Sequence, residues 1–230
     1  MFYRSSTTFY ERRRNPIEPL NNRCVCLSGV HRSGKTETAI LFGNTTKTKY
    51  FPMNLGDAPV WEHWNKDSSQ EFEFTERLEI QWLLLQWMRK QFSEFNEKTP
   101  AGKRFITDRS PLDLIVYLMA NSHGMTTVWE KSYQAVIDDC NKALNECVNK
   151  TFVISRNDNV DLISMLPGRI PENKRGEKHN SIPYRKLCDA LFHGVVETDV
   201  NNEDIIFIPK HLSSIETRVE FMKTNLKIND

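Results

Sequence analysis

The sequence predicts an α/β fold, in which a parallel sheet is flanked by helices, and two observations carry this prediction. Short apolar runs alternate along the chain with longer helical stretches, a pattern typical of parallel strands joined by crossover helices. A glycine-rich loop directly follows the first apolar run, where a strand would turn into a helix. No linker-like stretch divides the chain, so we expect one domain over residues 23–230, preceded by an N-terminal arm over residues 1–22.

The expected strands are apolar runs rich in β-branched and aromatic residues, at 23–27, 50–53, 104–107, 151–155 and 205–208. The expected helices run from the glycine-rich loop to about residue 42, and over 68–97, 111–120, 127–149, 182–196 and 213–226. On the longest helix the spacing predicts an inner stripe of Phe72, Leu78, Trp82, Leu85 and Met88. Residues 166–181 are polar and contain both proline and glycine, which predicts a loop.

Composition narrows the class of protein. The chain has 230 residues, of which 39% are hydrophobic, and its formal net charge is +1. Such a charge provides no overall field for nucleic acid or an anionic membrane, so a nucleic-acid partner is not favoured. No apolar run approaches the ~20 residues of a membrane-spanning helix, and we expect a cytoplasmic protein without a membrane partner. A homodimer is compatible with the sequence. The five cysteines form no C-x-x-C pair and are expected to be reduced core residues.

The loop from Gly29 to Thr36 has the pattern G-x-x-x-x-G-K-T. Its glycines let backbone N–H groups point at phosphate oxygens, and the helix that begins at Lys35 adds its N-terminal dipole. We expect Lys35 to reach the terminal phosphates and Thr36 to place its hydroxyl on Mg²⁺. No N-K-x-D element of the GTPase kind is present, so ATP is the expected nucleotide. The expected ATP-binding residues are Gly29, His31, Arg32, Ser33, Gly34, Lys35, Thr36 and Glu37.

A second acidic element, Asp108-Arg109, follows the predicted strand at 104–107. In a parallel sheet the carboxyl end of this strand faces the same crevice as the glycine-rich loop. Asp108 could therefore hold a magnesium-bound water, and Arg109 could grip a phosphate or neutralise charge in the transition state. Ser110, Pro111 and Asp113 have the pattern of an N-cap, a first-turn proline and an N3 acid, so we interpret them as helix-capping residues.

The loop at 29–36, taken together with Asp108-Arg109-Ser110, resembles the nucleoside and nucleotide kinase branch of P-loop proteins. This branch includes thymidylate kinases, deoxyribonucleoside kinases and nicotinamide riboside kinase-like proteins. The segment from Leu27 to Thr36 also resembles the start of phage-encoded deoxynucleoside monophosphate kinases. The resemblance implies a P-loop NTPase fold and transfer of the γ-phosphoryl group of ATP, with Mg²⁺, to a nucleoside or (deoxy)nucleoside monophosphate. It also implies that Arg109 contacts phosphate, as the matching arginine does in this branch.

The residues that would bind the phosphoryl acceptor are indicated by weaker sequence patterns. Asp57-Ala58-Pro59-Val60 is similar to the Glu-Pro-Val element of deoxyribonucleoside kinases, displaced by one residue. Asp57 or Glu62 is therefore a candidate base toward an acceptor hydroxyl. A turn aspartate explains Asp57 equally well, and a monophosphate acceptor would need no base. Similar kinases read the base with a glutamine on the long helix, which makes Gln81 the candidate. Four tryptophans, with Trp64 the main candidate, could hold a flat base or belong to the core.

The predicted loop after residue 166 is basic, and the resemblance places a mobile lid there. Arg169 and Arg175, with Arg185 next, are candidates to close over the phosphates and exclude water. A solvated charged loop is the alternative. Two other functions stay open at this point. One is a kinase acting on a nucleotide within DNA or at a strand end, which the basic run at 12–14 would suit. The other is a nucleotide-dependent regulatory or binding module with little turnover.

Overall fold

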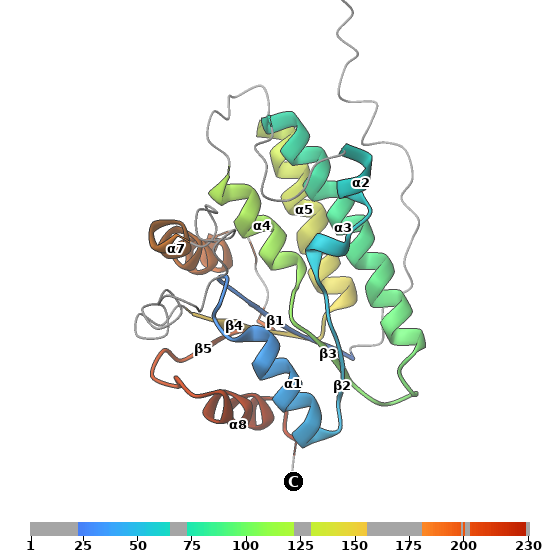
Figure 1. Cartoon of the computed structure of the whole chain (residues 1–230), viewed down its shortest axis with the longest axis vertical. Coiled ribbons are helices and arrows are strands. Elements are labelled where there is room, and N and C mark those ends of the chain that lie inside the picture. Colours follow the sequence, from blue (N-terminus) through green and yellow to red (C-terminus); the bar gives the residue numbers. More distant parts are fainter. Residues whose placement is uncertain are drawn as a thin grey trace, which may run out of the picture.

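The computed structural model describes residues 23–64, 73–121, 130–155, 181–198, 200 and 203–228 (Figure 1). The expected arm over residues 1–22 and the lid candidates Arg169 and Arg175 lie outside these residues. The same holds for the side chains of residues 63 and 64. The described residues form one sheet with helices on both of its faces, as the alternating pattern of the sequence predicts.

The sheet has five strands, all parallel, in the order β2-β3-β1-β4-β5. Their bounds are Cys24–Gly29 for β1, Lys49–Phe51 for β2, Phe105–Thr107 for β3, Lys150–Ile154 for β4 and Ile205–Ile208 for β5. Strand β1 lies between β3 and β4, with Cys26 opposite Thr107 and Gly29 opposite Ile154. Because the chain crosses to the other side of β1 after β3, a crevice opens at the carboxyl ends of these strands, where ligands bind in such sheets.

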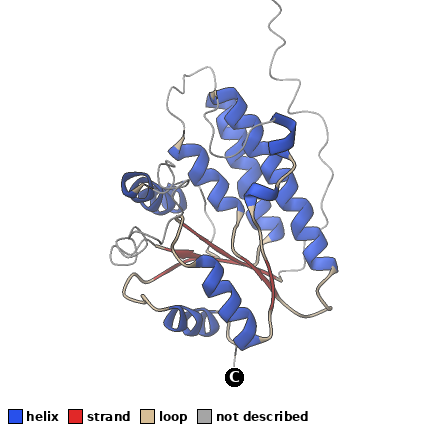
Figure 2. Ribbon diagram, in the orientation of Figure 1, coloured by secondary structure: helices blue, strands red, loops and turns tan. Residues whose placement is uncertain are grey.

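Helices α1 (Lys35–Thr46) and α8 (Ile215–Asn225) cover one face of the sheet (Figures 1 and 2). The other face carries α3 (Phe74–Glu97), α4 (Pro111–Ala120), α5 (Glu130–Cys147) and α7 (Ile182–Thr198). A short 3-10 turn at Leu55–Asp57 and helix α2 (Val60–Trp64) lie between β2 and α3. Three layers result, with the strand ends that form the crevice between the two helical layers.

Alternation along the strands produces two hydrophobic cores. Cys24 and Cys26 of β1 point into the core beneath α3, α4, α5 and α7. Val25 and Leu27, their neighbours on the same strand, point into the core beneath α1 and α8. All five cysteines are buried, which confirms their interpretation as core residues. Burial raises the pKa of Cys147 to about 12, so this thiol is protonated and unreactive at neutral pH.

The predicted strands and helices are confirmed among the described residues, with differences at their ends and on one helix, whereas the predicted loop at 166–181 lies outside these residues except for Ser181. Helix α1 runs four residues beyond the expected end at residue 42, and the separate helix α2 was not expected. The expected stripe on α3 is wrong at Trp82, which is only half-buried, while Phe72 lies outside the described residues. The buried stripe runs through Leu78, Leu85, Met88, Phe92 and Phe95, whereas Gln81 is half-buried like Trp82.

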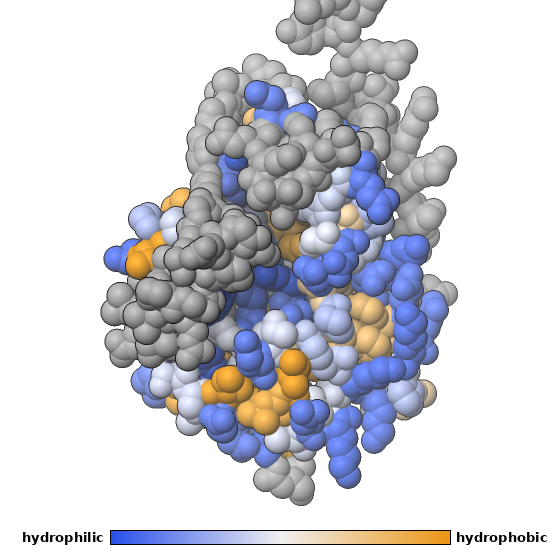
Figure 3. Space-filling model, in the orientation of Figure 1, coloured by the Kyte–Doolittle hydropathy of each residue, from blue (hydrophilic) through white to orange (hydrophobic). Residues whose placement is uncertain are grey.

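The surface of the described residues carries an apolar area beside a hydrophilic one. Apolar side chains gather over α1 and α8 in Figure 3, where Ile40 is 45% exposed. Hydrophilic side chains line the surface just above α1 in the same view. Among the described residues, no helix is both long and apolar enough to cross a membrane.

Candidate active site

The glycine-rich loop lies at the end of β1 and has an unusual backbone. Gly29, Arg32 and Gly34 have φ values of 138°, 61° and 85°. A Cβ atom at Gly29 would lie 2.3 Å from the carbonyl oxygen of Ile154 on β4, so only glycine fits this close approach. Gly34 is the N-cap of α1 in a left-handed conformation and provides no side-chain cap. The first N–H groups of α1 are therefore free of a capping side chain, as an anion-binding helix start requires.

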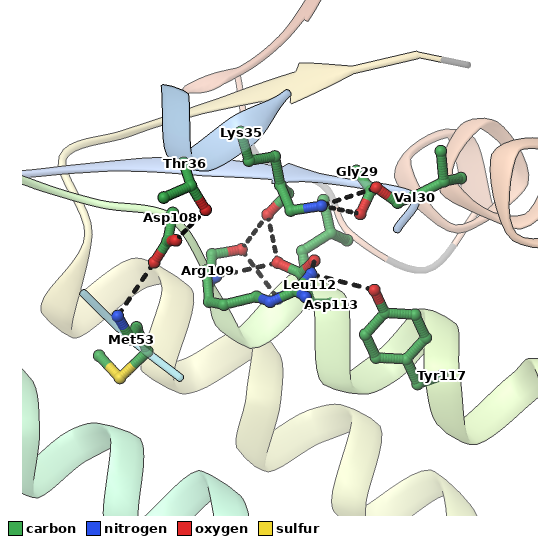
Figure 4. Close-up of polar contacts among 12 residues, drawn as sticks. Gly29, Val30, Lys35, Thr36, Met53, Asp108, Arg109, Leu112, Asp113 and Tyr117 are labelled. Atoms are coloured by element: carbon green, nitrogen blue, oxygen red, sulfur yellow. Dashed lines mark hydrogen bonds and ion pairs between the residues drawn. The ribbon is translucent and has the colours of Figure 1, made fainter. Parts of the chain in front are cut away.

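Lys35 begins α1 and curls back onto the loop. Its Nζ donates hydrogen bonds of 2.9 Å to Gly29 O and 2.7 Å to Val30 O, and the residue is 6% exposed (Figure 4). Burial, followed by the positive charge of Arg109, lowers the pKa of Lys35 to about 7. The hydrogen-bond acceptors of this ammonium group are carbonyl oxygens, so a nearby anion would stabilise its charge. The loop places the ammonium group at the crevice.

Asp108 follows β3 and meets α1 directly. Thr36 Oγ1 donates a 2.6 Å hydrogen bond to Asp108 Oδ2, as Figure 4 shows. The same carboxylate accepts a 3.0 Å bond from the Tyr50 hydroxyl of β2 and a 2.9 Å bond from the backbone N–H of Met53. The structure thus brings together the two residues that the sequence assigns to the metal. It also adds Tyr50, which sequence reasoning missed.

The chemistry of this pair suits a small, hard cation. Burial alone would raise the pKa of Asp108, but the hydrogen bonds from Thr36, Met53 and Tyr50 outweigh it and lower that pKa, so the carboxylate is ionised. Mg²⁺ prefers oxygen ligands and takes few of them from protein, the rest coming from phosphates and water. A hydroxyl and a carboxylate at the same spot fit this ligand set. No larger cluster of metal-binding side chains occurs among the described residues.

Arg109 lies beside Asp108 but is anchored on α4. Its Nη1 donates to Asp113 Oδ1 at 3.1 Å and to the Tyr117 hydroxyl at 3.0 Å, and the guanidinium carbon lies 5.8 Å from the centre of the Tyr117 ring. Burial favours the neutral form, yet Tyr117, Asp113 and Asp108 outweigh it and raise the pKa of Arg109 above its usual range. The guanidinium is therefore a permanent, oriented positive charge at the crevice.

Asp113 has a second role besides the cap that the sequence predicts. The capping box of α4 is present, with Ser110 as N-cap, which confirms that interpretation. The carboxylate, only 1% exposed, also accepts a 2.8 Å hydrogen bond from Ser28 Oγ at the end of β1. It thereby joins the strand of the glycine-rich loop to Arg109. The spacing of four residues between Arg109 and Asp113 is a signal that could have indicated their ion pair.

Further charged and aromatic residues lie at or near the glycine-rich loop. The His31 ring stacks on Tyr117, with centroids 5.2 Å apart. Arg185 of α7 is 1% exposed, and its charge contributes to the lowered pKa of Lys35. The Oγ atom of Ser33 is buried without a hydrogen-bond partner among the described residues. Of the other expected ATP-binding residues, Arg32 is half-buried and Glu37 is exposed on the first turn of α1.

The residues that the sequence predicts for acceptor binding differ in exposure and in whether the structure describes their side chains. Asp57 is exposed, and its Oδ1 accepts a 2.9 Å hydrogen bond from Asn54 Nδ2, as a turn aspartate does. Its role as a base stays a prediction. Trp64 belongs to α2, but its side chain lies outside the described residues. The Trp61 indole donates to the carbonyl oxygen of Leu55 and packs against the core.

Gln81 has the feature that a base-reading residue needs. The residue is half-buried on α3, but its Oε1 atom is buried without a hydrogen-bond partner among the described residues. A buried amide oxygen without a donor is unfavourable by about 1–3 kcal/mol, so such groups are rare unless a ligand or water completes them. The role of Gln81 in reading the base stays a prediction.

Comparison with known proteins bears on the fold. The sequence matches no protein-family model and no curated protein. Among solved structures, the chain is similar to deoxyadenosine kinase from M. mycoides with bound dATP, at 14% identity and a TM-score of 0.61 over 89% of this chain and 99% of that one. It is also similar to thymidylate kinase from Candida albicans, at 16% identity and a TM-score of 0.61 over 90% and 95% of the two chains. The chain therefore has the fold of P-loop nucleoside and nucleotide kinases.

Proposed function

We propose that this protein is a kinase that transfers the γ-phosphoryl group of ATP, with Mg²⁺, to a nucleoside or (deoxy)nucleoside monophosphate. One observation carries the proposal: Thr36 of the glycine-rich loop and Asp108 of β3 meet at 2.6 Å at the crevice of the sheet. Two elements far apart in sequence thus form one constellation of the kind that phosphoryl transfer requires. The shared fold with two kinases supports the same reaction class.

On the donor side, each residue has a distinct task. The N–H groups of the loop and of the start of α1 bind phosphate oxygens, and Lys35 leaves the carbonyls of Gly29 and Val30 to bind the terminal phosphates. Thr36 and Asp108 hold Mg²⁺, which neutralises phosphate charge when bound. Arg109 binds the transferring or accepting phosphate while Asp113 and Tyr117 hold it in position.

On the acceptor side, we assign base recognition to Gln81, because its buried Oε1 is free to accept from an amino or imino group of a base. Trp64 would stack on the base, and Asp57 would act as base only for an acceptor with a free hydroxyl. Arg169 and Arg175 would close the site as a lid, and Arg185 supports the phosphate path from α7. The homodimer and the cytoplasmic location stay predictions.

The test is phosphate transfer by the purified full-length chain from labelled ATP, with Mg²⁺, to a panel of nucleosides and monophosphates. We expect ADP formation that depends on one acceptor class and is abolished in Lys35→Ala without loss of the circular dichroism spectrum. Lys90→Ala, at an exposed position of α3, is the matched control and should retain full activity. Turnover only with DNA would instead indicate a kinase for polynucleotides, and tight ATP binding without transfer would indicate a regulatory module. An unchanged turnover number in Lys35→Ala would overturn the kinase assignment.

A further inference from the structure

Arg218 of α8, the helix that packs beside α1 on the same face of the sheet, contacts the glycine-rich loop. Its Nη1 donates a 2.7 Å hydrogen bond to the carbonyl oxygen of Ser33, which is 185 residues away in sequence. Its Nε donates a 3.0 Å bond to Leu212 O, just before α8. The residue is 5% exposed; its bond to Ser33 is buried and its bond to Leu212 is partly buried. No motif in the sequence indicates this contact.

The bond to Ser33 has a consequence for the next peptide N–H. The peptide between Ser33 and Gly34 is planar and trans, so its carbonyl oxygen and its N–H point in opposite directions. Because Arg218 holds the carbonyl on the α8 side, the N–H of Gly34 points away from α8. A Cβ atom at Gly34 would lie 3.1 Å from Arg218 Nη1, which shows how closely the guanidinium supports this turn.

The charge of Arg218 also lacks a counter-charge within the described residues. Its hydrogen-bond acceptors are two main-chain carbonyls, and no described carboxylate lies within ion-pair distance. Arg109, by contrast, is paired with Asp113, and Arg89 with Glu146. A buried charge without a partner is costly, so a nearby anion would be bound more tightly for it. The loop that Arg218 touches is the one that binds anionic phosphates in the proposed function.

We propose that Arg218 is a positioning residue of the donor site, which aims the Gly34 N–H at the phosphates and whose counter-charge is the polyphosphate of the nucleotide. This inference rests on ATP binding by the loop from Gly29 to Thr36. Helix α8 thereby contributes to the affinity for the nucleotide, whereas other elements recognise the acceptor. The contribution should grow with the number of phosphate charges, which a purely structural arginine would not produce.

The experiment is direct calorimetric titration of the full-length chain with MgATP and with MgADP, at low and at high salt. Arg218→Met removes the charge and both donors at similar length, and we expect ATP affinity to fall at least tenfold, ADP affinity to fall less, and the salt dependence to weaken. Arg218→Gln retains an N–H donor without the charge. It tests the same loss of charge if the Met variant does not fold. Arg218→Lys, which retains the charge, should bind ATP more tightly than either.

Arg104→Met is the matched control. Arg104 Nη1 also donates to a carbonyl oxygen, that of Leu226 at 3.4 Å, but Leu226 caps the C-terminal end of α8, remote from the loop. We expect this variant to bind ATP within twofold of the wild type. If the wild type binds ATP and the Arg218 variants bind it equally well, with only a lower melting temperature, the inference is wrong while the proposed function stands. If the wild type itself does not bind ATP, the proposed function fails, and the inference fails with it.

Discussion

Thr36 Oγ1 and Asp108 Oδ2 are joined by a 2.6 Å hydrogen bond between the first turn of α1 and the end of β3. The bond places the hydroxyl and the carboxylate of the two sequence motifs at one point of the crevice. Met53 and Tyr50 hold the same carboxylate from the β2 side, so that three donors fix its orientation. Because the Met53 backbone leads into the acceptor-side turn, Asp108 connects the donor loop to the segment where the acceptor would dock.

Asp108→Asn should lower Mg²⁺-dependent turnover by about 10²-fold or more, because the amide retains the shape of the side chain but loses the charge that a metal needs. Nucleotide binding in the presence of a chelator should change far less, since the loop and Lys35 are intact. A magnesium titration of the initial rate, combined with calorimetry in EDTA, measures the two effects separately.

Asp138→Asn is the control for Asp108→Asn. Asp138 is exposed on α5 and hydrogen-bonded only to Gln134 among the described contacts, so its loss of charge should leave the magnesium titration unchanged. Equal losses of metal-free and metal-dependent binding in Asp108→Asn would show that the carboxylate supports the loop and does not serve the metal.

Arg109→Ala should lower the maximal rate by about 10²-fold or more, because a fixed positive charge at the phosphoryl path is lost. The substitution also leaves Asp113 as a buried carboxylate without its ion-pair partner, which costs about 3–5 kcal/mol of stability. Arg109→Lys separates the two effects, since it retains a charge for Asp113 but loses the planar fork that grips phosphate. We expect the Lys variant to be folded and still at least tenfold slower at saturating substrate. If both variants altered thermal unfolding alone, the role of Arg109 would be confined to the anchoring of α4.

The sequence predicts best what local signals determine. Helix α4 has the predicted bounds, Pro111–Ala120, because its N-cap, first-turn proline and N3 acid all lie within four residues. The parallel sheet follows from strands that alternate with helices, and the glycine-rich loop follows from its own motif. These features need no knowledge of what the distant parts of the chain contact.

Contacts between distant segments could not be predicted in this way. Ser28 and Asp113 are 85 residues apart, and neither residue type indicates a partner. The choice between Trp82 and Gln81 on α3 is similar: both fit a helical period within one residue, and hydrophobicity favours the tryptophan. Tertiary packing leaves both side chains half-buried, but the amide oxygen of Gln81 is itself buried without a hydrogen-bond partner among the described residues.

Gln81→Leu should therefore affect acceptor recognition and not the fold. Replacing a buried, unpartnered amide by an apolar group of similar size should leave the melting temperature unchanged or raise it. The KM for the acceptor should rise at least tenfold because a hydrogen bond to the base is lost, while ATP affinity stays the same. Gln91→Leu, at a half-buried position further along α3, is the control and should leave the acceptor KM unchanged. An unaltered acceptor KM in Gln81→Leu would show that this residue only fills the core.

Nucleotide binding should take up a proton above pH 7, because of the state of Lys35. In the free protein, burial and then the charge of Arg109 lower the pKa of Lys35 to about 7, so the amine is mostly neutral at pH 8. Phosphate oxygens favour the ammonium form and raise that pKa in the complex. Binding above pH 7 is therefore coupled to protonation, and ATP affinity should fall by up to about tenfold for each pH unit between 7 and the pKa of the bound state.

Calorimetry at pH 8 in two buffers of different ionisation enthalpy measures this proton directly. At pH 8 the wild type should take up close to one proton per ATP. Below pH 6 the uptake by Lys35 should disappear, because its amine is already charged in the free protein. Any proton exchange measured there comes from ATP itself. Lys35→Arg is the matched variant, because a guanidinium stays charged throughout this range. Its ATP affinity should be nearly independent of pH between 7 and 9, even if it is weaker. Equal uptake by the wild type and Lys35→Arg would place the titrating group elsewhere in the crevice and would leave Lys35 charged in the free protein.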